Sequence, residues 1–393
     1  MPNRRLLFRS PLPDGKRAPL ARVPRLPHPH HLPERSTYKS HPTWKRSCLT
    51  FRTTTAKATF STSSQTDRRN RSTQQSNTQS NDRPTTKMAA ERSANFEAQL
   101  KRNPHPDFKK EEASRPPFDT SSTFRYTQTP DPSWVFGRGA NQLEGNPHER
   151  HPHIPIDPHA EGRPSAFNYK LLISAVIPRP IAFLSTRGPD VPGQEGGGVT
   201  NLAPFSYFQM INHDPPLFVI GFTGPADVSS AKDSLRNLVQ TKECVINIIG
   251  EDFVEAANST SINAPYGKSE WNISGLNPVY SCETVPRVPR VAEAIFSIEG
   301  KLESFREFQS KATPDKTSGT MVIIEGTRFW ARKDAINEDL SQLDAKVLRP
   351  MSRLGGITYG RVTEALELPR PDFKKDLGGE EGYAKLADRE KAN

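Results

Sequence analysis

The sequence predicts a mainly β fold in the second half of the chain, arranged as one barrel or sandwich. Three observations support this prediction. Short apolar runs recur between about residues 167 and 368, turn residues such as Gly, Pro, Asn and Asp separate them, and few segments have helical periodicity. Six or more short strands with few helices argue against a doubly wound parallel sheet.

The strands are predicted in chain order from these apolar runs. Regular structure begins near Phe167 and leads into a first strand at residues 181–186 and a second at 201–208. A third strand at 217–222 is bounded by the turn sequences Asp214-Pro215-Pro216 and Gly224-Pro225. The remaining predicted strands cover residues 244–249, 294–305, 320–330 and 361–368.

Three helical segments are predicted around these strands. Ser230-Ala231-Lys232-Asp233 fits a capping box that opens the first helix. Its apolar residues then lie on one face, at Ala231, Leu235, Leu238 and Val239. Residues 253–262 and 334–348 are also expected to be helical, while residues 374–393 are expected to fray or to form a surface helix.

The charge of the chain is distributed unevenly. The first 87 residues contain 18 Lys and Arg but 4 Asp and Glu, a formal charge of +14, which leaves −4 for the remaining 306 residues. Residues 1–87 are rich in Pro, Ser, Thr and Gln, so they lack the apolar surface to offset chain entropy and are predicted to be a disordered basic tail. Because the predicted folded body is acidic, nucleic acid is not an expected partner.

Three interpretations of the basic tail remain open. An Arg- and Ser-rich, acid-poor N-terminus resembles an organelle transit peptide, although its prolines interrupt an amphipathic helix. The run Arg68-Arg69-Asn70-Arg71 is either a nucleic-acid contact or a solvated charge run. In the third interpretation, the protein effectively begins at Met88. The expected location is cytoplasmic, with a mitochondrial location as the alternative.

The rest of the chain is predicted to have three parts: a proline-rich arm at 88–162, a domain at 163–368 and a C-terminal tail at 369–393. No apolar run approaches the ~20 residues of a membrane span, so no membrane partner is expected. The three cysteines form no CxxC pair, which indicates a reducing compartment. Prolines separate four histidines of the arm, so no metal site is predicted at His148, His151, His153 or His159.

Several common catalytic motifs are absent from the sequence. Neither glycine cluster completes a GxGxxG fingerprint, and the segment ending in Gly267-Lys268-Ser269 lacks the first glycine of a P-loop. No GxSxG nucleophile motif occurs. No catalytic side chain is therefore predicted.

An anion site and a ligand-binding hairpin remain as candidates. The helix start at Lys232-Asp233-Ser234 combines free backbone N–H groups, a lysine and a hydroxyl, although a capped helix with solvated charges has the same pattern. In the second strand, Asn201, Ala203 and Ser206 are small or hydrogen-bonding residues among aromatics. They would let a planar ligand approach the backbone, and Arg179 would add a cation.

These segments together resemble a known family. The run Ile177 to Thr186, the run Asn201 to Phe208, Asp214-Pro215-Pro216, Lys232-Asp233-Ser234 with Asn237, and Arg353-Leu354-Gly355-Gly356 stand in the order found in the flavin reductase-like, FMN-binding split-barrel family, which includes flavoredoxins. The resemblance covers residues 167–359. It implies a six-stranded split β-barrel with a few flanking helices, a homodimer, and FMN near the subunit interface.

The resemblance also implies a set of cofactor-binding residues. Arg179, Ser185 and Thr186 would approach the flavin or its ribityl chain. Asn201, Ala203 and Ser206 would contact the ring edge and the phosphate side, Lys232 and Ser234 would hold the phosphate, and Tyr359 would lie near the ring. Residues 189–198 enlarge a hairpin turn that is usually short in this family, and we expect them to form either a mobile cover or a surface insertion.

The function expected from this resemblance is that of an FMN-dependent oxidoreductase. NADH or NADPH would pass a hydride to flavin N5, so the expected partners are flavin and nicotinamide small molecules. The alternative is a flavoredoxin-like FMN electron carrier that serves a protein partner without catalysis of its own.

Overall fold

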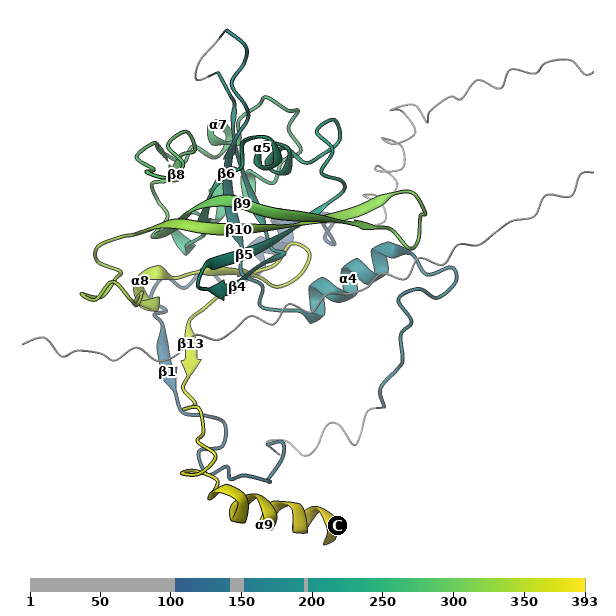
Figure 1. The fold of residues 1–393 in the computed structure, drawn as a ribbon, viewed down its shortest axis with the longest axis vertical. Coiled ribbons are helices and arrows are strands. Elements are labelled where there is room, and N and C mark those ends of the chain that lie inside the picture. The colour runs from purple at the N-terminus through teal and green to yellow at the C-terminus, as the bar shows by residue number, and fades with distance from the viewer. Residues whose placement is uncertain (1–102, 142–151, 194–196, 393) are drawn as a thin grey trace, which may run out of the picture. The chain divides into compact units, whose positions relative to one another are not determined.

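The structure is a computed structural model that describes residues 103–141, 152–193 and 197–392 (Figure 1). All of these residues belong to one compact unit, residues 80–393. The predicted disordered tail at 1–87 lies outside the described residues, as do His148 and His151. Within the described part, none of the helices is long and apolar enough to cross a membrane.

A seven-stranded antiparallel sheet forms the centre of the fold, in the order β3-β2-β6-β9-β10-β5-β4 (Figure 1). Its strands are β2 (Ala182–Arg187), β3 (Thr200–Phe205), β4 (Phe208–His213), β5 (Pro216–Thr223), β6 (Glu243–Ile248), β9 (Phe296–Gln309) and β10 (Thr317–Ala331). The predicted mainly β architecture is therefore confirmed, and β2, β5, β6, β9 and β10 match the predicted strands closely.

The predicted count of six strands in the barrel differs from the seven observed, because the second predicted strand is divided. Its residues 201–205 lie in β3 at one edge of the sheet, whereas Phe208 begins β4 at the opposite edge. Only Ser206 and Tyr207 separate these two edge strands. The ring of Phe205 lies 4.6 Å from that of Phe222 in β5, so the sheet curls until its two ends approach each other. The hydrogen-bonded ladder itself stays open between β3 and β4.

The two largest apolar cores of the described residues lie against the two faces of this sheet. On the concave face, α5 (Asp233–Thr241) packs Leu235 and Leu238 against Leu184 and Ile324, as its predicted apolar face requires. The opposite face carries Phe183 and Leu202, which pack against residues of η1 (Glu251–Phe253), α6 (Val254–Ser259) and α7 (Glu270–Ser274). Burial of these side chains stabilises the fold by about 1.5–3 kcal/mol each.

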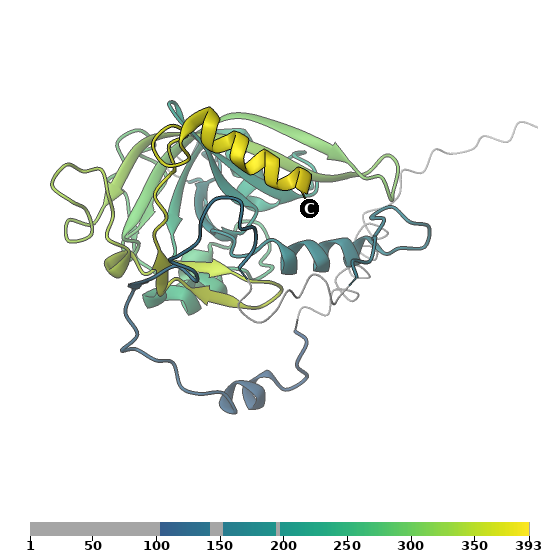
Figure 2. The ribbon, with the colours of Figure 1, turned by 90° about the horizontal axis from the view of Figure 1, so that it is seen from below.

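One predicted helix is mostly absent, and one helix was not predicted. Residues 334–348 form a helix only at α8 (Ala345–Leu348), because the Asn337 side chain accepts the backbone N–H groups of Ser341 (2.8 Å) and Gln342 (3.0 Å) and so stabilises a loop. Before the first strand, α4 (Ser165–Ala175) is an additional helix at the periphery of the sheet (Figure 2).

The smaller strands and helices complete the fold. Two short sheets pair β7 (Pro278–Val279) with β8 (Arg290–Val291), and β11 (Met351–Arg353) with β12 (Tyr359–Arg361). The last predicted strand, at 361–368, is observed as the end of β12 followed by β13 (Glu364–Leu366). The C-terminal tail contains α9 (Gly379–Ala392), which agrees with a surface helix.

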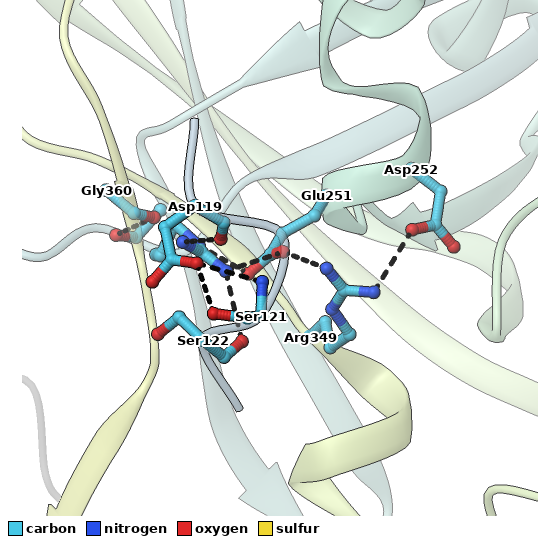
Figure 3. A network of polar contacts seen from close by, with 9 residues as sticks. Asp119, Ser121, Ser122, Glu251, Asp252, Arg349 and Gly360 are labelled. Atoms are coloured by element: carbon cyan, nitrogen blue, oxygen red, sulfur yellow. Dashed lines mark hydrogen bonds and ion pairs between the residues drawn. The ribbon is translucent and has the colours of Figure 1, made fainter. Parts of the chain in front are cut away.

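The described part of the proline-rich arm is tied to the C-terminal segment. Its α2 (Phe108–Ala113) precedes β1 (Arg125–Thr127), which pairs in parallel with β13. The guanidinium of Arg361 donates to the carbonyls of Asp119 (3.0 Å) and Ser122 (3.3 Å) and also pairs with buried Glu251 at 2.8 Å (Figure 3). Arg361 therefore joins the arm, η1 and β12.

Candidate functional site

Polar side chains meet where the hairpin of β2 and β3 approaches α5. Thr186 and Asn201 are paired across the hairpin, and both are buried. From α5, Asn237 donates its Nδ2–H to Thr186 Oγ1 (3.2 Å), and Ser234 donates its Oγ–H to Asn201 Oδ1 (2.5 Å). The structure thus brings together three of the predicted site residues, Thr186, Asn201 and Ser234.

Two residues from the following loop and from α7 complete this cluster. Glu270 Oε2 accepts the Nδ2–H of Asn201 (2.7 Å), and the Tyr266 hydroxyl donates to Asn237 Oδ1 (3.1 Å). The Arg236 guanidinium lies over the Tyr266 ring, 4.1 Å from its centroid. We call the six hydrogen-bonded residues the polar frame: Thr186, Asn201, Ser234, Asn237, Tyr266 and Glu270.

Gly188 follows β2 and lies directly against the polar frame. A Cβ atom at this position would lie 2.9 Å from the Tyr266 hydroxyl and 3.3 Å from Asn237 Oδ1. A larger residue would therefore push Tyr266 away from Asn237. Glycine at this position lets the backbone pass close to the frame.

The start of α5 differs from the predicted capping box. The helix begins at Asp233 after Lys232, and no described side chain caps it. Ser230 instead donates its hydroxyl to Asp227 Oδ2 (3.2 Å) in the preceding turn. The first intrahelical bond runs from Arg236 N–H to the Lys232 carbonyl (2.8 Å), so the N–H groups of residues 233–235 have no partner within the helix. Lys232 is exposed beside them.

Two carboxyl groups lie close to this helix start. Burial raises the pKa of Glu270 above its ordinary value, even though hydrogen bonds from Leu202 N–H and the Asn201 amide favour the charged form. Burial likewise raises the pKa of Asp233, against the attraction of Arg236 and Lys232. The helix start is thus a place where an added anion meets backbone donors and a lysine, but also acidic neighbours.

The predicted residues of β2 and β3 differ in their exposure. Ser185 and Thr186 have no exposed surface, and the Ser185 hydroxyl has no hydrogen-bond partner among the described residues. Ala203 and Ser206 are half-buried and lie on or next to the edge strand β3. Of these four residues, only Ala203 and Ser206 therefore present surface to a ligand in this conformation.

Arg179 and Tyr359 belong to a second group, centred on Arg353. Arg179 is buried, and its Nη1 donates to the carbonyls of Ile173 (2.5 Å) and Val176 (2.7 Å) at the end of α4. Its backbone pairs with that of Arg353, whose guanidinium lies 4.3 Å from the centroid of the Tyr359 ring. The Arg179 side chain therefore closes the C-terminus of α4, and its contact with a flavin stays a prediction.

The enlarged turn after β2 borders a cavity of about 480 Å³. Arg187 holds this turn by donating to the Gly198 carbonyl (3.0 Å) and to Asp190 (3.0 Å). The cavity is lined mainly by Arg187, Val199, Thr200, Ser269, Trp271 and Tyr280. No group of three or more His, Cys, Asp or Glu suited to a metal ion occurs among the residues that the structure describes.

Sequence reasoning missed Glu270 and Tyr266 as members of the site. Glu270 lies 69 positions after Asn201, and Tyr266 lies 29 positions after Asn237. Tyr266 lies in the loop before α7 and Glu270 is the first residue of α7, so only the tertiary fold brings them to α5 and β3. For Glu270 alone, the sequence offers a signal in the two polar side chains immediately before the apolar Trp271.

A family model described as "Flavin reductase like domain" matches residues 174–347 of this chain. The Halalkalibacterium halodurans protein BH2278 is 35% identical over 215 residues, which cover 53% of this chain and 93% of that protein. This chain belongs to the flavin reductase-like family. The Bacillus subtilis protein YwrF, another relative, is 33% identical over 206 residues, or 52% of this chain and 93% of YwrF.

The flavin reductase-like segment contains the whole polar frame and the start of α5, whereas the described part of the arm and α9 lie outside it. Among solved structures, nitrilotriacetate monooxygenase component B from Bacillus cereus is 32% identical in sequence to this chain. The match covers 56% of this chain and 100% of that one, with a TM-score of 0.48.

Proposed function

We propose that this flavin reductase-like chain binds FMN and reduces it with NADH or NADPH. The observation that carries the proposal is the uncapped start of α5, with exposed Lys232, directly beside the polar frame that joins the β2–β3 hairpin to α5. Membership of the family supports a flavin as the ligand, and the phosphate of FMN is the group that suits this helix start.

The phosphate is expected to meet the backbone N–H groups at the start of α5. These groups and the positive end of the helix dipole favour an anion, and Lys232 adds a full charge. The dipole contributes about 0.3–1 kcal/mol, and each charge-assisted hydrogen bond about 1.5–3 kcal/mol. Together they offset the repulsion from Asp233 at the same helix start.

The ring is expected to lie along the accessible part of β3. Ala203 has a small side chain and Ser206 a hydroxyl, so both allow a planar group to approach the backbone. Tyr359, half-buried at β12, is the proposed aromatic neighbour. These residues position the ligand and exclude water from one side of it.

Bound FMN would supply the redox chemistry, because its N5 accepts a hydride from NADH or NADPH and a proton from solvent completes the reduction. The protein contributes binding and orientation. This division of tasks explains why no side chain of the site is assigned as a general acid or base.

A homodimer is part of the proposal. Helix α4 exposes apolar side chains on several sides, although only Ala166 and Ile173 are buried against the rest of the chain. Its exposed residues, with those that follow it, are Phe167, Leu171, Leu172, Val176 and Ile177. β4 exposes Met210 and Ile211 as well. Such patches are typical of protein interfaces, and a second copy of the chain is the proposed partner.

The proposal is tested by adding FMN to the purified full-length chain and following binding by the quenching of flavin fluorescence. We expect saturable binding with one FMN per chain. Reduction is then measured by adding NADH or NADPH without oxygen and recording the loss of the visible absorption of oxidised flavin. A chain that binds no FMN would contradict the proposal.

A further inference from the structure

β3 is an edge strand, yet one of its outward backbone donors has a charged partner. The Leu202 N–H donates to Glu270 Oε2 at 3.1 Å. The carboxylate, presented by the first residue of α7, takes the place that a neighbouring strand would otherwise occupy. Glu270 therefore fixes the position of β3 relative to α7.

The same carboxylate oxygen also orients the Asn201 side chain. A carboxylate accepts hydrogen bonds and the amide nitrogen donates them, so the Asn201 nitrogen faces Glu270 (2.7 Å). The amide oxygen must then point the other way, and it accepts the hydroxyl of Ser234 at 2.5 Å. Glu270 thus fixes the direction of the Asn201 amide, and this direction places the amide oxygen where Ser234 donates to it.

Ser234 is the second residue of α5, and it is buried. Because its hydroxyl is donated to Asn201, its side chain is not a free donor for a ligand, whereas its backbone N–H has no partner within the helix. A displacement of Asn201 would therefore move the first turn of α5, where the unpaired N–H groups and Lys232 converge.

We propose that Glu270 is a positioning residue for phosphate recognition, acting through Asn201 and Ser234 to hold the start of α5 in place. The inference rests on the proposed function, since it assigns the α5 N-terminus to the phosphate of FMN. Asn201 and Ser234 then serve the site by their position, without direct contact with the flavin.

A second Glu–Asn pair of the chain provides a matched control. Glu293 accepts both the backbone N–H of Asn277 (3.2 Å) and its Nδ2–H (2.7 Å), which is the same donor chemistry at an exposed position. Glu293→Gln removes the same charge as Glu270→Gln, but it changes no residue of the polar frame.

The experiment compares FMN with riboflavin, which lacks the phosphate, in the full-length chain. We expect Glu270→Gln and Ser234→Ala each to weaken FMN binding about tenfold, because a displaced helix start would lose about one charge-assisted hydrogen bond to the phosphate. Each variant should change riboflavin binding less than about threefold. Because both act through Asn201, the double variant should lose little more than the larger single loss. Glu293→Gln should bind both flavins like the unaltered chain.

The possible results separate the inference from the function on which it rests. If the unaltered chain binds no FMN, the proposed function and the inference both fail. If the unaltered chain binds FMN but Glu270→Gln lowers the affinity for FMN and riboflavin equally, or lowers neither affinity, the inference alone fails. If the double variant lost the product of the two single fold-decreases in FMN affinity, Glu270 and Ser234 would act independently and not through Asn201. Should Glu270→Gln not fold, Ser234→Ala tests the path from the helix side.

A measurement without flavin gives a further check. Amide hydrogen exchange at Leu202 should be slow in the unaltered chain, although β3 is an edge strand, and faster in Glu270→Gln. Equal exchange in both proteins would show that Glu270 does not hold β3.

Discussion

The indole Nε1–H of Trp330 donates to Glu299 Oε1 at 2.6 Å, which links a fully buried carboxylate of β9 to the neighbouring strand β10. The other oxygen, Oε2, accepts the backbone N–H of Thr284 and its hydroxyl, both at 2.6 Å. Glu299 therefore holds the loop that contains Val285 and Val288 against the sheet. The free energy of unfolding should therefore depend on whether the Glu299 carboxylate is charged.

Replacing Glu299 by Gln is expected to lower the free energy of unfolding by about 1.5–3 kcal/mol, because hydrogen bonds to a charged acceptor are lost. Burial alone would raise the pKa of Glu299, but the hydrogen bonds from Thr284, Trp330 and the backbone lower it from 4.5 to about 2. Its contribution is thus complete above pH 4.5 and is lost as the pH falls toward 2.

Urea unfolding of the two proteins at several pH values checks this prediction. The difference in unfolding free energy should shrink as the medium becomes more acidic. Glu303→Gln, an exposed position on the same strand, should have little effect at any pH. A difference that stays constant down to the lowest pH would contradict the role of the charge.

Arg361→Ala is expected to release the proline-rich arm. The variant leaves the Glu251 carboxylate, 4% exposed, with Arg349 as its remaining cation partner, and removes two donors to arm carbonyls (Figure 3). Because Arg349 remains, the loss of stability should be smaller than the about 3–5 kcal/mol of leaving a buried charge without a partner. Arg361 also stacks 4.4 Å from the Phe118 ring centroid.

Limited proteolysis measures the release of the arm. Cleavage near residues 118–127 should be faster in Arg361→Ala, with a lower melting temperature. The matched control is Arg332→Ala, which breaks an exposed pair with Asp334 and should leave the cleavage rate unchanged. Equal rates in all three proteins would show that the arm is held by other contacts.

Lys232→Ala should weaken FMN binding about tenfold through the loss of one charge-assisted contact with the phosphate. Riboflavin binding should change little, because riboflavin offers no phosphate to Lys232. Fluorescence titration with both flavins checks the difference. Lys311→Ala, an exposed lysine near the turn between β9 and β10, is the control for the loss of charge. An equal loss for both flavins would refute the phosphate role.

Leu172→Glu is expected to convert the proposed dimer to a monomer. Leu172 is 57% exposed on α4, so a charge there would be desolvated in an interface without a partner. Light scattering after gel filtration gives the mass directly. Leu368→Glu, at an exposed position after β13, should leave the mass unchanged. A monomeric unaltered chain would contradict the dimer.

The sequence was sufficient for the strands with a continuous apolar run, such as β5 and β6, and for the apolar face of α5. It failed where local polar contacts decide the backbone. The Asn337 side chain ends the helical pattern at 334–344, and the bend at Ser206 and Tyr207 sends one predicted strand to both edges of the sheet. Neither the Asn337 side-chain contacts nor the bend at Ser206 and Tyr207 produces a periodic pattern in the sequence, so neither could be predicted from it.

The candidate site likewise contains residues that the sequence predicted and residues that it did not. Thr186, Asn201 and Ser234 were predicted together, and the hydroxyls of Thr186 (3.5 Å) and Ser234 (2.5 Å) both donate to Asn201 Oδ1. Glu270 was missed because its partner lies 69 positions away. Direct flavin contact by the buried Ser185 and by Arg179 stays a prediction.

The measurement that tests the central claim most directly is an anaerobic titration of the FMN-loaded full-length chain with NADH and with NADPH, followed by visible absorption. We expect one of the two nucleotides to bleach the oxidised flavin completely at one equivalent per FMN. A chain that takes up no FMN would contradict the assignment, and a yellow chain that neither nucleotide bleaches would identify an electron carrier in place of a reductase.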